Sequence, residues 1–350
     1  MSYLSSLFVR PASPFAPPST LYLLLFHPLT TLISFLHHIL LTLRGVPYRP
    51  PPSAIPINVV CISDTHSQIP PSALPKGDLL IHAGDLSKTG TLSDIQRSID
   101  WLKTLQKPWY GSSDGYRYIV VIAGNHDSYF DPRSRSAHDK RNEKTRNLDW
   151  GKIIYLEHSS VTLPFPGDRK LKVYGAPQIP KCGGKDFAFQ YARSHDAWTD
   201  TLPEDIDVLV THNPPKWHLD IPENGGLGDE HELKECWRIK PTLHVCGHIH
   251  SGHGKEYLWW DEAQRQMEDF RRAAWRSYPE LQSRSIAAWL NEVLSVRLWM
   301  MAVKVVWLDC KGLIWTWFWG ASRNGSIFVN AALTYQTTEE LLNPPQTVVL

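Results

Sequence analysis

Five short apolar runs in the sequence each lead into aspartate, asparagine or histidine. The runs are Cys61-Ile62-Ser63, Leu79-Leu80-Ile81, Ile119-Val120-Val121-Ile122, Val208-Leu209-Val210 and Leu243-His244-Val245-Cys246. The polar segments that follow them are Asp64-Thr65-His66, Gly84-Asp85, Gly124-Asn125-His126-Asp127, Thr211-His212-Asn213 and Gly247-His248-Ile249-His250. Runs of this length and composition predict buried strands. Because ligands bind beyond the carboxyl ends of strands in α/β sheets, we expect the five polar segments to form one site.

The residue types in these segments indicate a pair of metal ions. Carboxylate and imidazole ligands without thiolate suit manganese, iron or zinc in a catalytic rather than a structural site. Two divalent ions about 3.5–4 Å apart can hold a phosphate and supply a hydroxide near neutral pH. Ions that close need a carboxylate between them, and Asp85 is the natural bridge. A single histidine after an apolar strand is usually a packing residue, so the prediction depends on the whole set.

The motif order D-x-H, G-D, G-N-H-D, a later histidine and G-H-x-H resembles that of the calcineurin-like metallophosphoesterases. The resemblance covers about Ile57 to His253 and a last strand near Ile327–Ala331. The segments Gly175-Ala176-Pro177 and Thr211-His212-Asn213-Pro214-Pro215 are similar to those of one subfamily. It comprises small metallophosphoesterase-domain proteins related to class III cyclic-nucleotide phosphodiesterases.

The resemblance implies an α/β (α+β) fold, specifically a four-layer α/β/β/α sandwich with a binuclear metal centre. The implied ligands of the first ion are Asp64, His66, Asp85 and His250. Those of the second ion are Asp85, Asn125, His212 and His248. In the same scheme His126 faces the substrate and Asp127 orients His126. No ligand position of the motif is missing, which favours an active hydrolase.

The expected reaction is hydrolysis of a phosphate ester by in-line attack of a metal-activated hydroxide, with His126 stabilising charge or protonating the leaving oxygen. A phosphodiester is the favoured substrate, and a cyclic nucleotide is one candidate. The alternatives are a phosphomonoesterase or protein phosphatase, and a non-enzymatic membrane-associated scaffold. A formal net charge of +1 and the absence of a basic stripe in residues 57–257 disfavour a nuclease or a stable nucleic-acid complex.

An uncharged segment, Leu21 to Leu43, precedes the catalytic part and is long enough to span a bilayer. Its polar residues recur at three- and four-residue steps, so a helix would gather them on one side. They are His27, Thr30, Thr31, Ser34, His37, His38 and Thr42. Pro28 suits the first turn of a helix. A spanning anchor, an in-plane interfacial helix and a helix docked on the protein itself all remain open. Membrane association is favoured, and the proline-rich stretch Pro47–Pro56 is a stiff spacer.

The cysteines and the charges after this segment favour a cytosolic catalytic domain. There are five cysteines and none forms a C-x-x-C pair. Cys61 and Cys246 fall inside predicted strands, where reduced thiols behave as small apolar residues. If the segment spans a membrane, Arg44 and Arg49 place the following domain on the cytosolic side.

Four regions follow from these patterns: an N-terminal region at 1–56, a core at 57–257, an insert at 258–324, and a final strand with a tail at 325–350. Within the core, helices are predicted over Thr91–Gln106 and Asp229–Ile239. The insert contains nine tryptophans and shows helical spacing from Ile286 to Val305. A helical hairpin packed on the sheet and an interfacial membrane helix with basic residues fit this composition equally well.

Overall fold

The computed structural model describes residues 15–48, 50, 54–106, 115–141, 147–221, 225–276, 286–320 and 325–350. Its first sheet has five strands, and the first three of the five apolar runs form the three central ones. In spatial order the strands are β13 (Gln346–Val349), β1 (Asn58–Ile62), β2 (Leu79–Ala83), β3 (Tyr118–Ile122) and β4 (Ile154–Tyr155). Strands β1 to β4 run parallel, whereas β13 is antiparallel to β1.

The second sheet has six strands. In spatial order they are β11 (Gly254–Trp259), β12 (Gly325–Asn330), β10 (Leu243–Cys246), β9 (Val208–Thr211), β6 (Arg169–Ala176) and β5 (Ser159–Phe165). The four central strands are parallel, and both edge strands are antiparallel to their neighbours. A separate pair, β7 (Ile179–Pro180) and β8 (Gln190–Tyr191), lies outside both sheets. All five predicted strands are therefore present.

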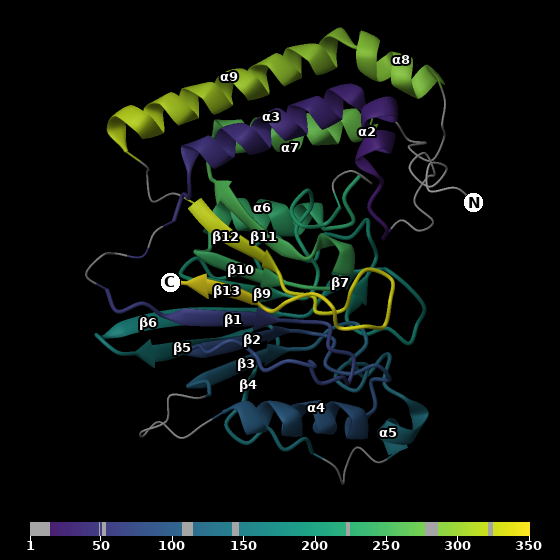
Figure 1. Ribbon diagram of the computed structural model, residues 1–350. Coiled ribbons are helices and arrows are strands. Elements are labelled where there is room, and N and C mark those ends of the chain that lie inside the picture. Colours follow the sequence, from purple (N-terminus) through teal and green to yellow (C-terminus); the bar gives the residue numbers. More distant parts are fainter. Residues whose placement is uncertain are drawn as a thin grey trace.

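The two sheets stack face to face between helices, which confirms the predicted α/β/β/α sandwich (Figure 1). Side chains alternate along each strand, so Val59 and Cys61 fill the core between the sheets while Val60 and Ile62 pack toward α4 (Leu92–Leu105). Helix α5 (Ala137–Arg141) is short and lies near the same face. Helices α6 (Glu230–Ile239) and α7 (Glu262–Arg276) cover the second sheet.

Leu21 to Leu43 does not form one continuous helix. It is divided at His27 into α2 (Thr20–Phe26) and α3 (Pro28–Arg44), with Pro28 in the first turn as predicted. Within the described residues, no helix combines the length and apolarity needed to cross a membrane. A spanning helix, one of the three arrangements that the sequence left open, is therefore not found among the described residues. The inner face of α3 packs against other helices of the chain, as the docked arrangement predicts.

The insert contributes helices that pack on one another and on the N-terminal region. They are α7, α8 (Ile286–Leu294) and α9 (Val296–Trp319). Helix α9 contacts both α3 and α7 over a shared apolar core. The insert also begins later than predicted. Leu258 and Trp259 are the last residues of β11, where they pair with Ser326 and Gly325 of β12.

Candidate metal centre

The polar segments after the five strands converge where the carboxyl ends of the two sheets meet. Asp64, Asp85 and Asn125 follow strands β1, β2 and β3 of the first sheet, and His212 and His248 follow strands β9 and β10 of the second. The described residues contain three overlapping triads of possible metal ligands. Within each triad, the ligand atoms lie within 4.8 Å of one another. The triads are Asp64–His66–His250, His66–Asp85–His126 and Asp64–Asp85–His212.

One end of the cluster is organised around Asp64. Its Oδ1 atom lies 3.3 Å from Nε2 of His250, and its carboxylate accepts the backbone N–H of His248 at 3.0 Å. The other ring nitrogen of His250 lies 2.9 Å from the carbonyl oxygen of Gln336. A proton on that second nitrogen would leave Nε2 as a lone pair facing the cluster, which is the form that binds a metal ion.

The other end of the cluster contains Asn125 and His212. Nε2 of His212 lies 3.0 Å from Oδ1 of Asn125 and 3.4 Å from Oδ1 of Asp85. Nδ1 of His212 lies 2.8 Å from the carbonyl oxygen of Ala83, which fixes the ring. The His248 ring lies beside it, with ring centroids 5.1 Å apart. His212 and Asn125 therefore direct possible metal-ligand atoms toward the same point as Asp85.

Asp85 lies between the two ends. Its Oδ2 atom is 3.9 Å from Nε2 of His66, while its Oδ1 atom faces His212. Asp85 is 2% exposed, so both oxygens are directed into the cluster rather than into solvent. Asp85 therefore directs one oxygen atom toward each end of the cluster.

The backbone at the ligand positions is held in an uncommon conformation. Four of the predicted ligands have φ in the left-handed region, which non-glycine residues rarely adopt and which is concentrated at functional sites. They are Asp64 (54°), His66 (45°), Asp85 (53°) and His248 (63°). The fold thus maintains strain at these positions, as a preorganised binding site requires.

Three glycines allow the ligand segments to approach closely. A Cβ atom at Gly84 would collide with the ring of His212, and one at Gly124 would collide with the carboxylate of Asp85. A Cβ at Gly247 would meet the carboxylate of Asp64. The glycines of the G-D, G-N-H-D and G-H-x-H motifs therefore leave the space that the ligands occupy. Carboxylate, imidazole and amide donors in this space fit one or more divalent cations.

The electrostatics of the cluster favour positive charge. Burial opposes ionisation of both aspartates, but the hydrogen bond and charge of His250 hold the pKa of Asp64 below its ordinary value, and the charge of His212 does the same for the pKa of Asp85. Burial favours the neutral ring of His212, yet the charge of Asp85 raises its pKa to about 9. Cations are therefore stabilised beside the two carboxylates.

His126 lies at the open side of this cluster. Its ring packs edge-on against His66, with centroids 4.8 Å apart, and against Phe187 at 4.9 Å. Nδ1 of His126 lies 3.2 Å from the carbonyl oxygen of Lys88, and its backbone N–H donates to Oδ1 of Asp85 at 2.8 Å. The ring is therefore fixed by a backbone carbonyl and faces the metal ligands.

The predicted role of Asp127 is wrong. Its carboxylate does not hydrogen-bond the ring of His126 and instead accepts the backbone N–H groups of Leu86, Ser87 and Gly124 at 2.9–3.1 Å. It also accepts the Ser87 hydroxyl at 2.8 Å. Burial and the charge of Asp85 raise the pKa of Asp127 to about 6. Asp127 joins the turns after β2 and β3, which makes it a positioning residue.

Asn330 is a positioning residue that the sequence analysis did not identify. Its side-chain amide donates to the carbonyl oxygens of Ile249 at 2.9 Å and Leu219 at 3.1 Å, and so fixes the turn between His248 and His250. The signal was present, because Asn330 follows the apolar run of the last strand just as the ligands follow theirs.

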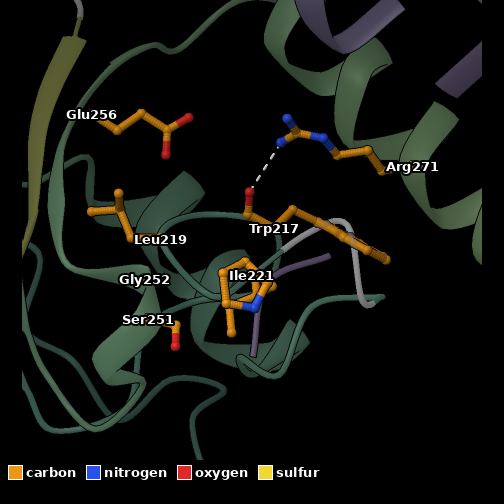
Figure 2. Close-up of a pocket in the computed structure, with 8 residues that line it drawn as sticks. Trp217, Leu219, Ile221, Ser251, Gly252, Glu256 and Arg271 are labelled. Carbon is orange, nitrogen blue, oxygen red and sulfur yellow. Dashed lines mark hydrogen bonds between the residues drawn. The ribbon is translucent and has the colours of Figure 1, made fainter. Parts of the chain in front are cut away.

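A cavity of about 230 Å³ lies behind the turn His250–Gly252. Its lining residues are Pro17, Trp217, Leu219, Ile221, Ser251, Gly252, Glu256 and Arg271. Figure 2 shows Glu256 and Arg271 on the same side of it, with the Arg271 guanidinium donating to the Trp217 carbonyl at 3.0 Å. None of the predicted ligands lines this cavity, so it is separate from the metal cluster.

Carboxylate, imidazole and amide ligand atoms where the edges of two stacked sheets meet form a candidate centre for divalent metal ions. Known proteins agree with this interpretation. The profile of the calcineurin-like phosphoesterase family matches residues 57–252. The chain belongs to that family.

Three curated relatives show where the similarity lies. A protein of Emericella nidulans named probable rhamnogalacturonate lyase C is 42% identical over 214 residues, 61% of this chain and 19% of that protein. Human metallophosphoesterase domain-containing protein 1 is 33% identical over 60% of this chain and 65% of its own length. A UPF0046 protein of Caenorhabditis elegans is 30% identical over 59% of this chain and 68% of its own length. The chain thus spans less than two thirds of the first two relatives.

Proposed function

We propose that this protein hydrolyses phosphodiesters with two divalent metal ions, manganese, iron or zinc, held between the sheets. The position of Asp85 carries the proposal, because its two oxygens face histidines from different sheets, His212 at 3.4 Å and His66 at 3.9 Å. The first ion would be held by Asp64, His66, Asp85 and His250, and the second by Asp85, Asn125, His212 and His248.

The residues of the chain have separate tasks in this reaction. Two bound ions would supply positive charge to the phosphoryl oxygens and lower the pKa of a water molecule between them. His126, held by the Lys88 carbonyl, is placed to donate a proton to the leaving oxygen or to stabilise negative charge on the phosphoryl group. Phe187 packs on the His126 ring and limits the access of bulk water to it.

The charges around the centre favour a diester over a monoester. A diester carries one negative charge, whereas a phosphate monoester carries about 1.5 to 2 near neutral pH and needs more cationic partners. Lys88 is adjacent to the site, but its ammonium group is paired with Glu339 at 2.7 Å. Its charge is thus already partly compensated, which supports a substrate of lower charge.

The test compares two substrates on the full-length chain. Metal is removed by a chelator and restored as manganese, and kcat/KM is measured for bis-p-nitrophenyl phosphate and p-nitrophenyl phosphate. We expect activity to require manganese, two ions to bind per chain, and the diester to be preferred. Cyclic 3′,5′- and 2′,3′-nucleotides, assayed next, test the finer assignment to cyclic nucleotides.

Each other outcome selects one alternative. Preference for the monoester would assign the centre to a phosphomonoesterase or protein phosphatase. Two bound ions without hydrolysis of either ester would support a scaffold in which metal serves stability. Asp309→Asn is the matched control for changes at the centre, since Asp309 is buried but lies on α9, away from the metal ligands. It should retain metal and activity.

A further inference from the structure

The N-terminal helices and the insert together form an outer helical layer, defined here as α2, α3, α8 and α9. Polar contacts join its two halves. His27 and His37 of the N-terminal segment contact Glu292 at 3.3 Å and Asp309 at 2.8 Å. Arg44 donates to Thr316 at 3.1 Å. From one contact to the next, the residue numbers increase along both segments. Helices α3 and α9 therefore run parallel, as Figure 1 also shows.

The acidic side chains and the histidines that make these contacts therefore face inward. Glu292 and Asp309 are at most 2% exposed, and the ring of His37 is buried against Asp309. This reverses the usual order of a surface helix, in which the polar face is turned to water. The layer uses its polar groups to join its two halves and leaves apolar groups outside.

The outer side of α9 is a continuous apolar stripe. Helical spacing places its exposed residues on one side of α9, opposite the buried Leu298, Ala302, Val305 and Leu313. The apolar residues of the stripe are Met300, Val303, Trp307, Ile314, Trp315 and Phe318. Trp307 is 68% exposed and Phe318 is 75% exposed. Clustered apolar groups of this size on a surface mark an interaction site.

The N-terminal half of the layer also exposes apolar residues. Large apolar residues of α2 and α3 are exposed there as well: Leu24, Leu25, Leu32, Phe35, Ile39 and Leu43. Figure 1 shows α9 as the outermost element, with α3 directly beneath it. Two segments separated by more than two hundred residues in the sequence thus each contribute exposed apolar residues to the outer helical layer.

The exposed charges of the layer all have one sign. In residues 15–45 and 286–320, the only acidic side chains are the buried Glu292 and Asp309. Arg297, Lys304 and Lys311 are exposed and lie seven residues apart, so they lie on the same side of α9 as the apolar stripe. Their long side chains can keep the charge in water while their stems lie along an apolar surface.

A surface that combines apolar residues with basic ones and lacks exposed acids is complementary to anionic lipid headgroups. The end of α9 adds a second feature of that kind. Its last turns carry Trp315, Trp317, Phe318 and Trp319, all exposed, and tryptophan is concentrated at the boundary between headgroups and acyl chains.

We propose that the outer helical layer docks the protein on an anionic lipid bilayer. Helix α9 lies along the membrane surface, with its tryptophan and aliphatic side chains in the headgroup–acyl boundary and its basic residues at the headgroups. The metal centre, on the sheet edges beneath the layer, stays in water. The proposal concerns location and does not depend on the substrate of the centre.

The test measures sedimentation of the full-length chain with vesicles of phosphatidylcholine alone or mixed with phosphatidylserine. We expect binding to increase with phosphatidylserine and to weaken at high salt, because salt screens exposed charges. The double change Lys304→Gln and Lys311→Gln should lower the partition coefficient for anionic vesicles roughly 30-fold, from about 1 kcal/mol for each basic residue near the surface.

A matched control removes the same charge elsewhere. Lys170 and Lys234 are exposed and lie in residues 57–257, outside the outer helical layer. The double change Lys170→Gln and Lys234→Gln should therefore leave vesicle binding unchanged. Trp307→Ser with Phe318→Ser should abolish binding to both kinds of vesicle. Metal content and ester hydrolysis, measured on every variant, show whether it is folded.

Three results would overturn the proposal. In the first, the chain stays in the supernatant with anionic vesicles. In the second, both pairs of lysine changes reduce binding equally. In the third, the chain is a dimer without lipid, Trp307→Ser converts it to a monomer, and neither form binds vesicles. That last result would assign the surface to a second copy of the chain.

Discussion

At Asp85, a single carboxylate faces histidines from both sheets. Asp85→Asn should release or scramble the metal ions and abolish hydrolysis, because a neutral amide does not screen two close cations as a carboxylate does. Bound metal, measured by elemental analysis, and diester hydrolysis report the result together. Asp309→Asn supplies the control, and a variant at Asp85 with full metal content and activity would contradict the bridging role.

His126 is fixed by a backbone carbonyl, so removing its ring should affect chemistry more than metal binding. His126→Ala is expected to retain both ions and to lower kcat by about 10²–10⁴-fold, the usual contribution of a positioned proton donor or charge stabiliser. The exposed His138 provides a control change to alanine. Because His126 lies within ligand distance of His66 and Asp85, loss of metal in proportion to activity would make it a ligand instead.

Asp127 should behave differently from its neighbour. Asp127→Ala leaves three buried backbone N–H groups without their acceptor, at a cost of about 1–3 kcal/mol for each unsatisfied group. We expect a lower melting temperature and weaker metal binding, whereas His126→Ala should melt like the unchanged protein. An Asp127→Ala variant of normal stability and normal metal affinity that had lost only turnover would restore the role of orienting His126.

At the scale of the elements, the turns after the strands depend on glycines that let neighbouring side chains pack close to the backbone. A Cβ atom at position 124 would overlap the Asp85 carboxylate and crowd His212. Gly124→Ala is therefore expected to abolish metal binding, as measured by titration calorimetry with manganese. Gly184→Ala is the matched control, since nothing lies within 4 Å of a Cβ there. Equal metal affinity in the two variants would show that the turn can widen without loss.

The strands and the convergence of the polar residues after them were predictable because the relevant signals are local. A short apolar run predicts a buried strand, and the residue after the run lies at the edge of the sheet, so the position of Asp64 or His212 follows from a few neighbouring residues. The role of Asp127 was not predictable in this way. Its carboxylate accepts the N–H groups of Leu86 and Ser87, about forty positions earlier in the chain. The sequence of the turn that contains Asp127 does not indicate these distant partners.

The orientation of the N-terminal helix also depends on distant residues. Its spacing correctly indicates that polar residues gather on one side, but not whether that side faces water. His27 and His37 turn inward because Glu292 and Asp309, more than 260 positions away, supply buried partners. The same long-range pairing explains the late start of the insert, since Leu258 and Trp259 extend β11 only because β12 lies beside them.

At the scale of the whole molecule, His218 joins the second sheet to the helices above it. It is buried and lies 3.2 Å from Glu256 of β11 and 3.1 Å from Glu268 of α7, with His244 of β10 nearby. Burial favours the neutral ring, but Glu256 and Glu268 raise the pKa of His218 to about 9.

This pairing should make stability depend on pH. Because the folded pKa lies above the unfolded value, the stabilisation is complete below about pH 6.5 and is lost as pH rises through about 9, a change of roughly 3 kcal/mol. The melting temperature of His218→Gln should therefore differ most from that of the unchanged protein near pH 6.5 and least near pH 9.5. A difference that is the same at both values would contradict the assignment.

Residues 325–350 are shared by both sheets. Strand β12 lies between β10 and β11 in one sheet, and β13 pairs Val348 with Val59 of β1 in the other. Between these strands, Thr334 donates to the Asp64 carbonyl at 2.7 Å, and the Gln336 carbonyl contacts the ring of His250.

During synthesis these residues leave the ribosome after the other strands of both sheets, so one edge of β1 stays unpaired until residues 325–350 have been made. Pairing between such distant strands is slow, and an unpaired edge is open to aggregation. We expect nascent chains that stop before residue 325 to need chaperones and to lack metal. Assembly of the metal centre thereby depends on the synthesis of residues 325–350.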